Sequence, residues 1–308
     1  MNGWIILDKP VGLGSTQAVG AVKRVCREAG LGKVKVGHGG TLDPLASGVL
    51  PIALGEATKL TGHMLDADKI YRFTIAFGVQ TSGLDLEGEV VATSEVRPTS
   101  RDVMAVLPQF LGPIEQIPPA FSAIKIGGER AYDLARKGQQ VEMQARKVTV
   151  HDLTLNDMAM DDLAMGDADL DAPLQSATFT AHVSKGTYIR SLARDLALAV
   201  GTVGHVTMLR RVKAGPFRLE QAISLDNLNA FGQGAAQSDI ILPLEVGLVD
   251  IPALDLSLEA AEAIRQGRIW TREGTQDGLY WGRGSDMRPI ALIQVSAEML
   301  KVVRGFNL

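Results

Sequence analysis

The stretch from Val36 to Lys59 constrains this chain more than any other part of its sequence. It reads VGHGGTLDPLASGVLPIALGEATK and places five glycines, two prolines, one histidine and one aspartate between apolar residues. The glycines permit tight turns, and the proline after Asp43 disfavours the α conformation at that aspartate. The apolar run from Leu45 to Leu54 indicates a buried segment. We therefore expect one carboxylate, Asp43, at the edge of a packed core.

Two glycine-rich phosphate-binding motifs are absent from this stretch. It contains neither a Walker sequence nor the Gly-x-Gly-x-x-Gly pattern of dinucleotide-binding folds. An aspartate before a proline is also a common turn former. Asp43 by itself therefore does not distinguish a catalytic carboxylate from a structural one.

Composition places the chain among ordinary globular proteins. Its 308 residues are 46% hydrophobic and 21% charged, which excludes a disordered chain and suits one large and one small domain. Cys26 is the single cysteine, and the five histidines show no HExxH-like spacing. We expect a metal-free, cytoplasmic protein without disulfides. The N-terminus MNGWIILDKP does not resemble a signal peptide, and no segment is long and apolar enough to predict a membrane span.

The net charge of −4 conceals a strong internal asymmetry. Between His182 and Arg218 there are seven lysines and arginines against one aspartate, whereas Val148–Ser176 contains seven aspartates and no lysine or arginine. A basic surface of this kind suits an RNA backbone. We expect the Met- and Asp-rich part of the acidic segment, Asp157–Asp171, to form a variable surface hairpin or loop.

The remaining pattern alternates short strands and helices. We expect strands at 3–7, 69–78 and 176–183, a helix at 15–29 capped by Ser15 and stopped by Gly30, a helix at 98–111, and another that follows Arg190 and ends near Val200. Asp8–Gly12 predicts a turn, and Val90–Val91 closes a hairpin. From about residue 250 the pattern changes to a helix at 258–266 followed by short strands with glycine-rich turns.

Several motifs together resemble those of the bacterial tRNA pseudouridine-55 synthase family, the TruB family. The resemblance rests on GHGGTLDPLASGVLPIALGEATK, on DKPVGLGS near the N-terminus, on QIPPAFSAIKIGGERAYDLARK and on GTYIR, and it covers almost the whole chain. In the first motif Asp43 matches the catalytic aspartate of the family. Ser82 and Gly83 depart from the pattern of the TSGLDLEG loop, which puts a role for those two residues in doubt, whereas Asp85 and Gly88 match it.

The resemblance implies a set of functional residues. The catalytic ones are Asp43, as nucleophile or base, Tyr71, stacked on the flipped base, and Arg190, placed against Asp43. The substrate-binding ones are His38, Tyr188, Leu209, Asp85, Lys185 and Arg130. Each has a structural alternative that stays open: a turn for His38, core packing for Tyr71, a structural ion pair for Arg190, and solvated charges for the basic residues.

The implied fold is α+β: a pseudouridine synthase domain at 1–249, with a central mixed, largely antiparallel sheet flanked by helices, and a small PUA-like β-barrel at 250–308. An insertion at about 116–147 would grip RNA. The implied activity is isomerisation of uridine 55 in the tRNA T-loop by a stand-alone, monomeric enzyme without a cofactor, which binds the T-arm stem-loop. The rivals are a non-catalytic RNA-binding or tRNA-chaperone protein on the same fold and a synthase of the guide-ribonucleoprotein type. Bacterial-type motifs and the lack of long basic tails disfavour the latter.

Overall fold

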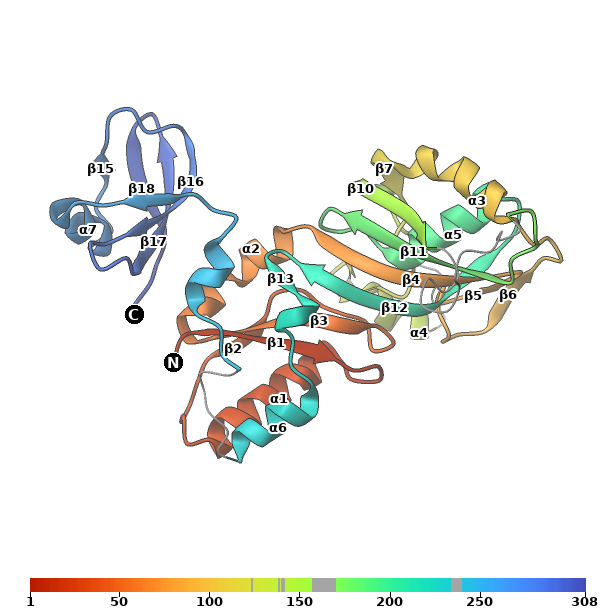
Figure 1. Cartoon of the computed structure of the whole chain (residues 1–308), viewed down its shortest axis with the longest axis horizontal. Coiled ribbons are helices and arrows are strands. Elements are labelled where there is room, and N and C mark those ends of the chain that lie inside the picture. Colours follow the sequence, from red (N-terminus) through yellow and green to blue (C-terminus); the bar gives the residue numbers. More distant parts are fainter. Residues whose placement is uncertain (123, 138, 140–141, 157–169, 234–239) are drawn as a thin grey trace. The chain divides into compact units, whose positions relative to one another are not determined.

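Figure 1 shows a computed structural model of the chain, which describes residues 1–308 except 123, 138, 140–141, 157–169 and 234–239. The chain forms two compact units. The first consists of Met1–Pro44, Gly48–Leu65 and Ala214–Leu308, and the second of Leu45–Ser47 and Asp66–Lys213. The predicted acidic loop at 157–171 lies outside the described residues, apart from its last two.

The first unit begins with an antiparallel pair of strands. Strand β1 (Gly3–Lys9) pairs along its full length with β3 (Ser47–Leu54), and β2 (Val36–His38) lies along the other edge of β3. Both long strands are almost wholly buried because their sequences are nearly continuous apolar runs. Helix α1 (Ser15–Glu28) lies beside α6 (Leu225–Gly232), as Figure 1 shows. The other elements of this part are η1 (Gly55–Leu60), α2 (Thr61–Asp66), β13 (Phe217–Arg218), η3 (Leu219–Gln221) and η5 (Leu244–Leu248).

The C-terminal part of this unit is the small curled β-structure that the sequence predicts. Five strands run in the order β14-β16-β17-β18-β15, and one helix, α7, packs against three of them. Their bounds are β14 (Ala253–Asp255), α7 (Leu258–Arg265), β15 (Trp270–Thr271), β16 (Gly278–Arg283), β17 (Pro289–Ser296) and β18 (Met299–Gly305). It has a hydrophobic core of its own, to which Ile264, Ile293 and Leu300 belong. The domain boundary at 249/250 stays a prediction.

The second unit is built on a sheet with the strand order β12-β4-β11-β10-β7. Its elements are β4 (Lys69–Phe77), β5 (Val79–Thr81), β6 (Val90–Thr93), α3 (Ser100–Val106), η2 (Leu107–Phe110), β7 (Gly112–Gln116), β8 (Lys125–Ile126), β9 (Glu129–Arg130), α4 (Ala131–Arg136), β10 (Arg146–Asn156), β11 (Ser176–Val183), α5 (Ile189–Ala199) and β12 (Gly204–Ala214). In this sheet β4 pairs with β11, β11 with β10 and β10 with β7, and these three pairs are antiparallel.

The core of the second unit lies between this sheet and the helices α3 and α5. Strand β11 buries alternate residues, and its Phe179 stacks on Phe73 of β4 with 5.3 Å between the ring centroids. Val103 of α3 and Leu192 of α5 complete the same cluster. The opposite side chains of β11, including His182, point to the other face of the sheet.

Two local predictions need correction. Ser15 is not the N-cap of α1, because that position is Gly14 and the Ser15 hydroxyl bonds elsewhere. The predicted turn at 8–12 begins too early, since β1 continues through Lys9, whose side chain is fully buried. In both cases a contact with a distant part of the chain outweighs the local preference. The stop of α1 at Gly30, where φ is +74°, agrees with the prediction.

Candidate active site

Asp43 lies in a loop of the first unit whose backbone is held on both sides of the aspartate. The Ser15 hydroxyl accepts a hydrogen bond from the Leu42 N–H at 2.8 Å and donates one to the Leu42 carbonyl at 2.9 Å. On the other side, the Pro44 carbonyl accepts from the Gly12 N–H at 2.8 Å. Leu42 is buried, whereas Asp43 is half-buried. The loop therefore presents its carboxylate from a fixed backbone.

Lys9 supplies a second support for the same loop. Its Nζ donates to the carbonyls of Pro10, Leu13 and Pro44 at 2.9, 2.7 and 3.3 Å. The side chain is completely buried, so these carbonyls and the ammonium group satisfy one another away from water. The DKP motif thus joins the end of β1 to the Asp43 loop through Lys9. Its role is therefore not limited to forming a local turn after the first strand.

His38 ends strand β2 in the first unit. Its Nδ1 accepts a hydrogen bond from the Gly40 N–H at 3.4 Å, a contact within its own turn. This contact agrees with the structural alternative for His38. Its part in substrate binding stays a proposal.

Arg190 is buried in the second unit at the start of α5 and is bound by three groups. Its guanidinium donates to Asp85 Oδ2 at 3.1 Å and to the carbonyls of Gly83 and Phe121, each at 2.9 Å. Only 7% of the Arg190 side chain and 14% of the Asp85 side chain is exposed. Two predicted site residues are therefore brought together as a buried ion pair. Gly83 contributes its backbone carbonyl, and a Cβ at this position would lie only 2.7 Å from the Glu87 carbonyl oxygen, so the turn favours glycine.

The loop that carries Asp85 is itself well fixed. Asp85 Oδ1 accepts from the Glu87 N–H at 3.0 Å, and the Thr81 hydroxyl donates to the Asp85 carbonyl at 2.6 Å. Leu84 adopts a positive φ of 61°, which is uncommon for a residue with a side chain. The guanidinium of Arg190 is thus held by an ordered turn.

Tyr71 and Leu209 border the core of the same unit, and Tyr188 is the N-cap residue of α5. Tyr71 on β4 pairs with Ala181 of β11, and both Tyr71 and Leu209 of β12 pack, partly buried, against the core cluster. Tyr188 precedes α5, and its N–H donates to the side chain of Gln116 at 2.8 Å. An aromatic ring and a leucine at the edge of a core suit a flat, apolar ligand surface.

Two basic residues, Lys185 and Arg130, are predicted to bind RNA. Lys185 is exposed, and its Nζ lies 3.0 Å from Asp66 Oδ1. Such a surface pair is weak and exchanges easily for a phosphate contact. Arg130 ends β9, which forms a two-residue hairpin with β8 inside the predicted insertion.

Lys69 and His182 have displaced pKa values. Burial, and next the positive charge of Arg211, lower the pKa of Lys69 to about 8, although Asp66 and Asp68 act in the opposite direction. Burial, and next His151, lower the pKa of His182, again against the effect of Asp68. Sequence reasoning missed both, because burial depends on what the fold packs against them.

The comparisons with known proteins bear on the whole chain. The N-terminal domain of the TruB family pseudouridylate synthases matches residues 27–189, and the C-terminal domain of tRNA pseudouridylate synthase B matches residues 190–249. This chain belongs to the TruB family. The family, the fold and the enzyme class, an isomerase, are therefore as predicted.

Two relatives in the family match this chain over almost their full length. A tRNA pseudouridine synthase B of Novosphingobium aromaticivorans is 62% identical over 308 residues, which cover 100% of this chain and 98% of that protein. One of Zymomonas mobilis is 54% identical, covering 100% of this chain and 96% of that protein. Among solved structures, a chain of an H/ACA RNP bound to a substrate RNA containing 2′-deoxyuridine aligns with 99% of this chain and 85% of its own. Its TM-score is 0.72 at 23% identity, which shows a shared fold.

The predicted site residues are distributed over both units. Asp43 and His38 belong to the first, whereas Tyr71, Asp85, Lys185, Tyr188, Arg190 and Leu209 belong to the second, with Arg130. The pairing of Asp43 with Arg190 stays a prediction. Among the helices of the described residues, none is both long and apolar enough to span a membrane.

Proposed function

We propose that this protein converts uridine 55 in the T-loop of tRNA to pseudouridine and that Asp43 is its essential carboxylate. The observation that carries the proposal is the loop at Asp43, where Ser15 and Lys9 hold the backbone on either side of the aspartate. A fixed backbone at Asp43 lowers the entropy that is lost when its carboxylate is oriented for reaction. The naming of the 62% identical relative as a tRNA pseudouridine synthase B supports tRNA as the class of substrate.

The isomerisation breaks the bond between C1′ and N1 of the uridine and forms a bond between C1′ and C5. The proton on C5 must leave, and N1 gains one, so that no atom is lost and no electrons are transferred. Asp43 acts either as the nucleophile that attacks the nucleoside or as the base that removes a proton. In this proposal Tyr71 stacks on the base and accepts a proton from it.

A uridine in a folded loop must leave its stack before it reacts. In this proposal His38 enters the space that the uridine leaves, and Tyr188 and Leu209 line the pocket that receives the base. The Arg190 guanidinium, oriented by Asp85, pairs with Asp43 and keeps that carboxylate ionised. The buried position of Arg190 supports a role in orientation over a role in phosphate binding.

Affinity for RNA comes from other residues. Lys185, Arg130 and the basic residues of the insertion at 116–147 contact the phosphate backbone of the T-arm, and loop bases give specificity. A T-arm stem-loop alone is then a sufficient substrate. The enzyme acts as a monomer, and its cytoplasmic location stays a prediction.

The proposal is tested by release of tritium from a tRNA transcript labelled at uracil C5. Asp43→Asn is expected to abolish turnover and to leave tRNA binding within about tenfold, because chemistry rests on the carboxylate and affinity on phosphate contacts. Asp226→Asn, an exposed aspartate of α6, is the matched control and should react like the wild type. Turnover by homogeneous Asp43→Asn enzyme would refute the role of Asp43. Binding without turnover by the wild type would favour the non-catalytic RNA-binding alternative.

A further inference from the structure

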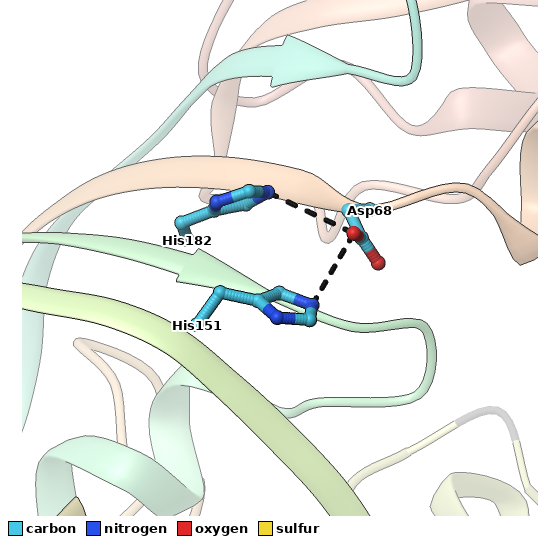
Figure 2. Close-up of side chains that lie close together, drawn as sticks. All are labelled: Asp68, His151 and His182. Carbon is cyan, nitrogen blue, oxygen red and sulfur yellow. Dashed lines mark ion pairs between the residues drawn. The ribbon is translucent and has the colours of Figure 1, made fainter. Parts of the chain in front are cut away.

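Three side chains that commonly bind metals meet on the sheet of the second unit, on the face opposite its core (Figure 2). Asp68 directly precedes β4, His182 lies on β11 and His151 on β10, and these three strands are neighbours in the order β4-β11-β10. Asp68 Oδ2 lies 3.2 Å from His151 Nε2 and 3.8 Å from His182 Nε2. Both imidazole rings thus point to the same carboxylate oxygen.

A β-bulge brings His151 to this face. Val150 pairs with Val183 and Asp152 pairs with His182, so that His151 is an additional residue in β10. Val150 and Leu153 are buried, whereas His151 and Asp152 between them are both exposed. The bulge therefore directs two consecutive side chains outward and returns Leu153 to the core. Bulges of this kind often orient side chains at functional sites.

We propose that Asp68, His151 and His182 form a binding site for a divalent transition-metal ion, with Zn²⁺ as the ion that the donors suit best. Two imidazole nitrogens and one carboxylate oxygen are a usual set of three protein ligands for zinc. All three donor atoms lie within 4.8 Å of one another. A tetrahedral ion with bonds of about 2.0 Å holds its ligand atoms about 3.3 Å apart, so small side-chain rotations complete the geometry.

The choice of ligand follows from the donors. Mg²⁺ and Ca²⁺ prefer oxygen atoms only, and one carboxylate offers too few of them. A phosphate or another anion is disfavoured because the Asp68 carboxylate faces both imidazoles and would repel it. The three side chains are between 35% and 48% exposed, so an ion reaches them from solvent and keeps water in its remaining positions.

The ion would connect three adjacent strands that are distant in sequence. Its ligands are separated by 83 and 31 residues, which is why the local spacing of histidines led to the expectation of a metal-free protein. An ion that binds only the folded chain stabilises it, and the stabilisation grows with the logarithm of the free ion concentration. The site contains none of the residues proposed for the isomerisation, so its occupancy and the catalytic activity are separate measurements.

The test uses the full-length chain without an affinity tag, freed of metal by a chelator and titrated with ZnCl₂ in a calorimeter, with MgCl₂ in parallel. We expect one Zn²⁺ per chain, bound at least tenfold more tightly than Mg²⁺. His151→Gln, His182→Gln and Asp68→Asn should each weaken zinc binding at least tenfold, the order of effect seen even for residues that only support metal ligands. The matched controls are Asp66→Asn, at a neighbouring carboxylate, and His205→Gln, at a histidine on β12. Each should change the affinity for zinc by less than about twofold.

A second readout separates ligand loss from misfolding. Co²⁺ bound in place of Zn²⁺ should give a visible absorption band with the wild type and both controls, and the band should be lost in His182→Gln. The three ligand variants and His205→Gln should keep the wild-type rate of pseudouridine formation, because none of these residues belongs to the proposed active site or contacts it, whereas Asp66 pairs with Lys185. Zinc binding that is no tighter than Mg²⁺ binding, or that the three ligand variants leave unchanged, would show an adventitious ion only and overturn the proposal.

Discussion

Lys69 makes the stability of this protein depend on pH in a predictable direction. Its side chain is 7% exposed at the start of β4, and its Nζ donates to the Ala67 carbonyl at 2.5 Å. Burial, helped by the positive charge of Arg211, lowers its pKa from 10.5 to about 8. The unfolded chain therefore holds the Lys69 proton more tightly than the folded chain does.

The sign and size of the effect follow from this difference. Below pH 8 the lysine is charged in both states, and the folded state carries the full cost of a buried charge. A pKa difference of about 2.5, at about 1.4 kcal/mol for each unit of pH, gives a cost of about 3 kcal/mol. The cost disappears as the pH rises from about 8 to 10.5. Between pH 7 and pH 9.5 the contribution of Lys69 to the free energy of unfolding should rise by about 2 kcal/mol.

The assay compares urea unfolding of the wild type with that of Lys69→Met at a series of pH values. Groups such as Cys26, whose buried thiol has a raised pKa, also titrate in this range, and they cancel in the difference between the two proteins. The free energy of unfolding of the wild type minus that of Lys69→Met should increase by about 2 kcal/mol between pH 7 and pH 9.5. Lys147→Met, at an exposed position on β10, is the control and should give a constant difference. A constant difference for Lys69→Met as well would refute the assignment of a low pKa to Lys69.

Three further predictions concern other buried contacts. Arg190→Lys should cut the single-turnover rate by on the order of tenfold to a thousandfold, with little change in tRNA affinity. The reason is that lysine lacks the planar guanidinium that binds Asp85 and two carbonyls at once. Weaker tRNA binding with an intact saturated rate would contradict this role. Lys9→Met should lower the free energy of unfolding, measured in urea, by about 3 kcal/mol, because it leaves three carbonyls at the Asp43 loop without their buried donor. An unchanged midpoint of urea unfolding would contradict this prediction. Phe306→Ala should lower the free energy of unfolding by about 3 kcal/mol, because Phe306 is buried in the same cluster as Trp4. It should also expose the C-terminal residues to carboxypeptidase. Resistance to carboxypeptidase equal to that of the wild type would show that the contact contributes little.

The sequence by itself determined most of the secondary structure and the family. Strands such as β4 and β11 follow from short-range alternation, and the stop of α1 follows from one glycine, because these preferences act between residues close in the chain. The motif around Asp43 was equally local, since turn residues and an apolar run lie within one stretch. The set of proposed catalytic residues came from motif resemblance and stays a proposal.

Only the tertiary structure decided which distant groups meet. Ser15 could cap a helix by its local sequence, yet its hydroxyl bonds to Leu42, and Arg190 binds Asp85, a residue 105 positions away. The cluster at Asp68 requires three strands and a bulge at His151 to bring its members together. Hydrogen bonds and ion pairs depend on distances in space, and those distances are set by strand order and packing of the entire unit. Local sequence patterns carry no record of them.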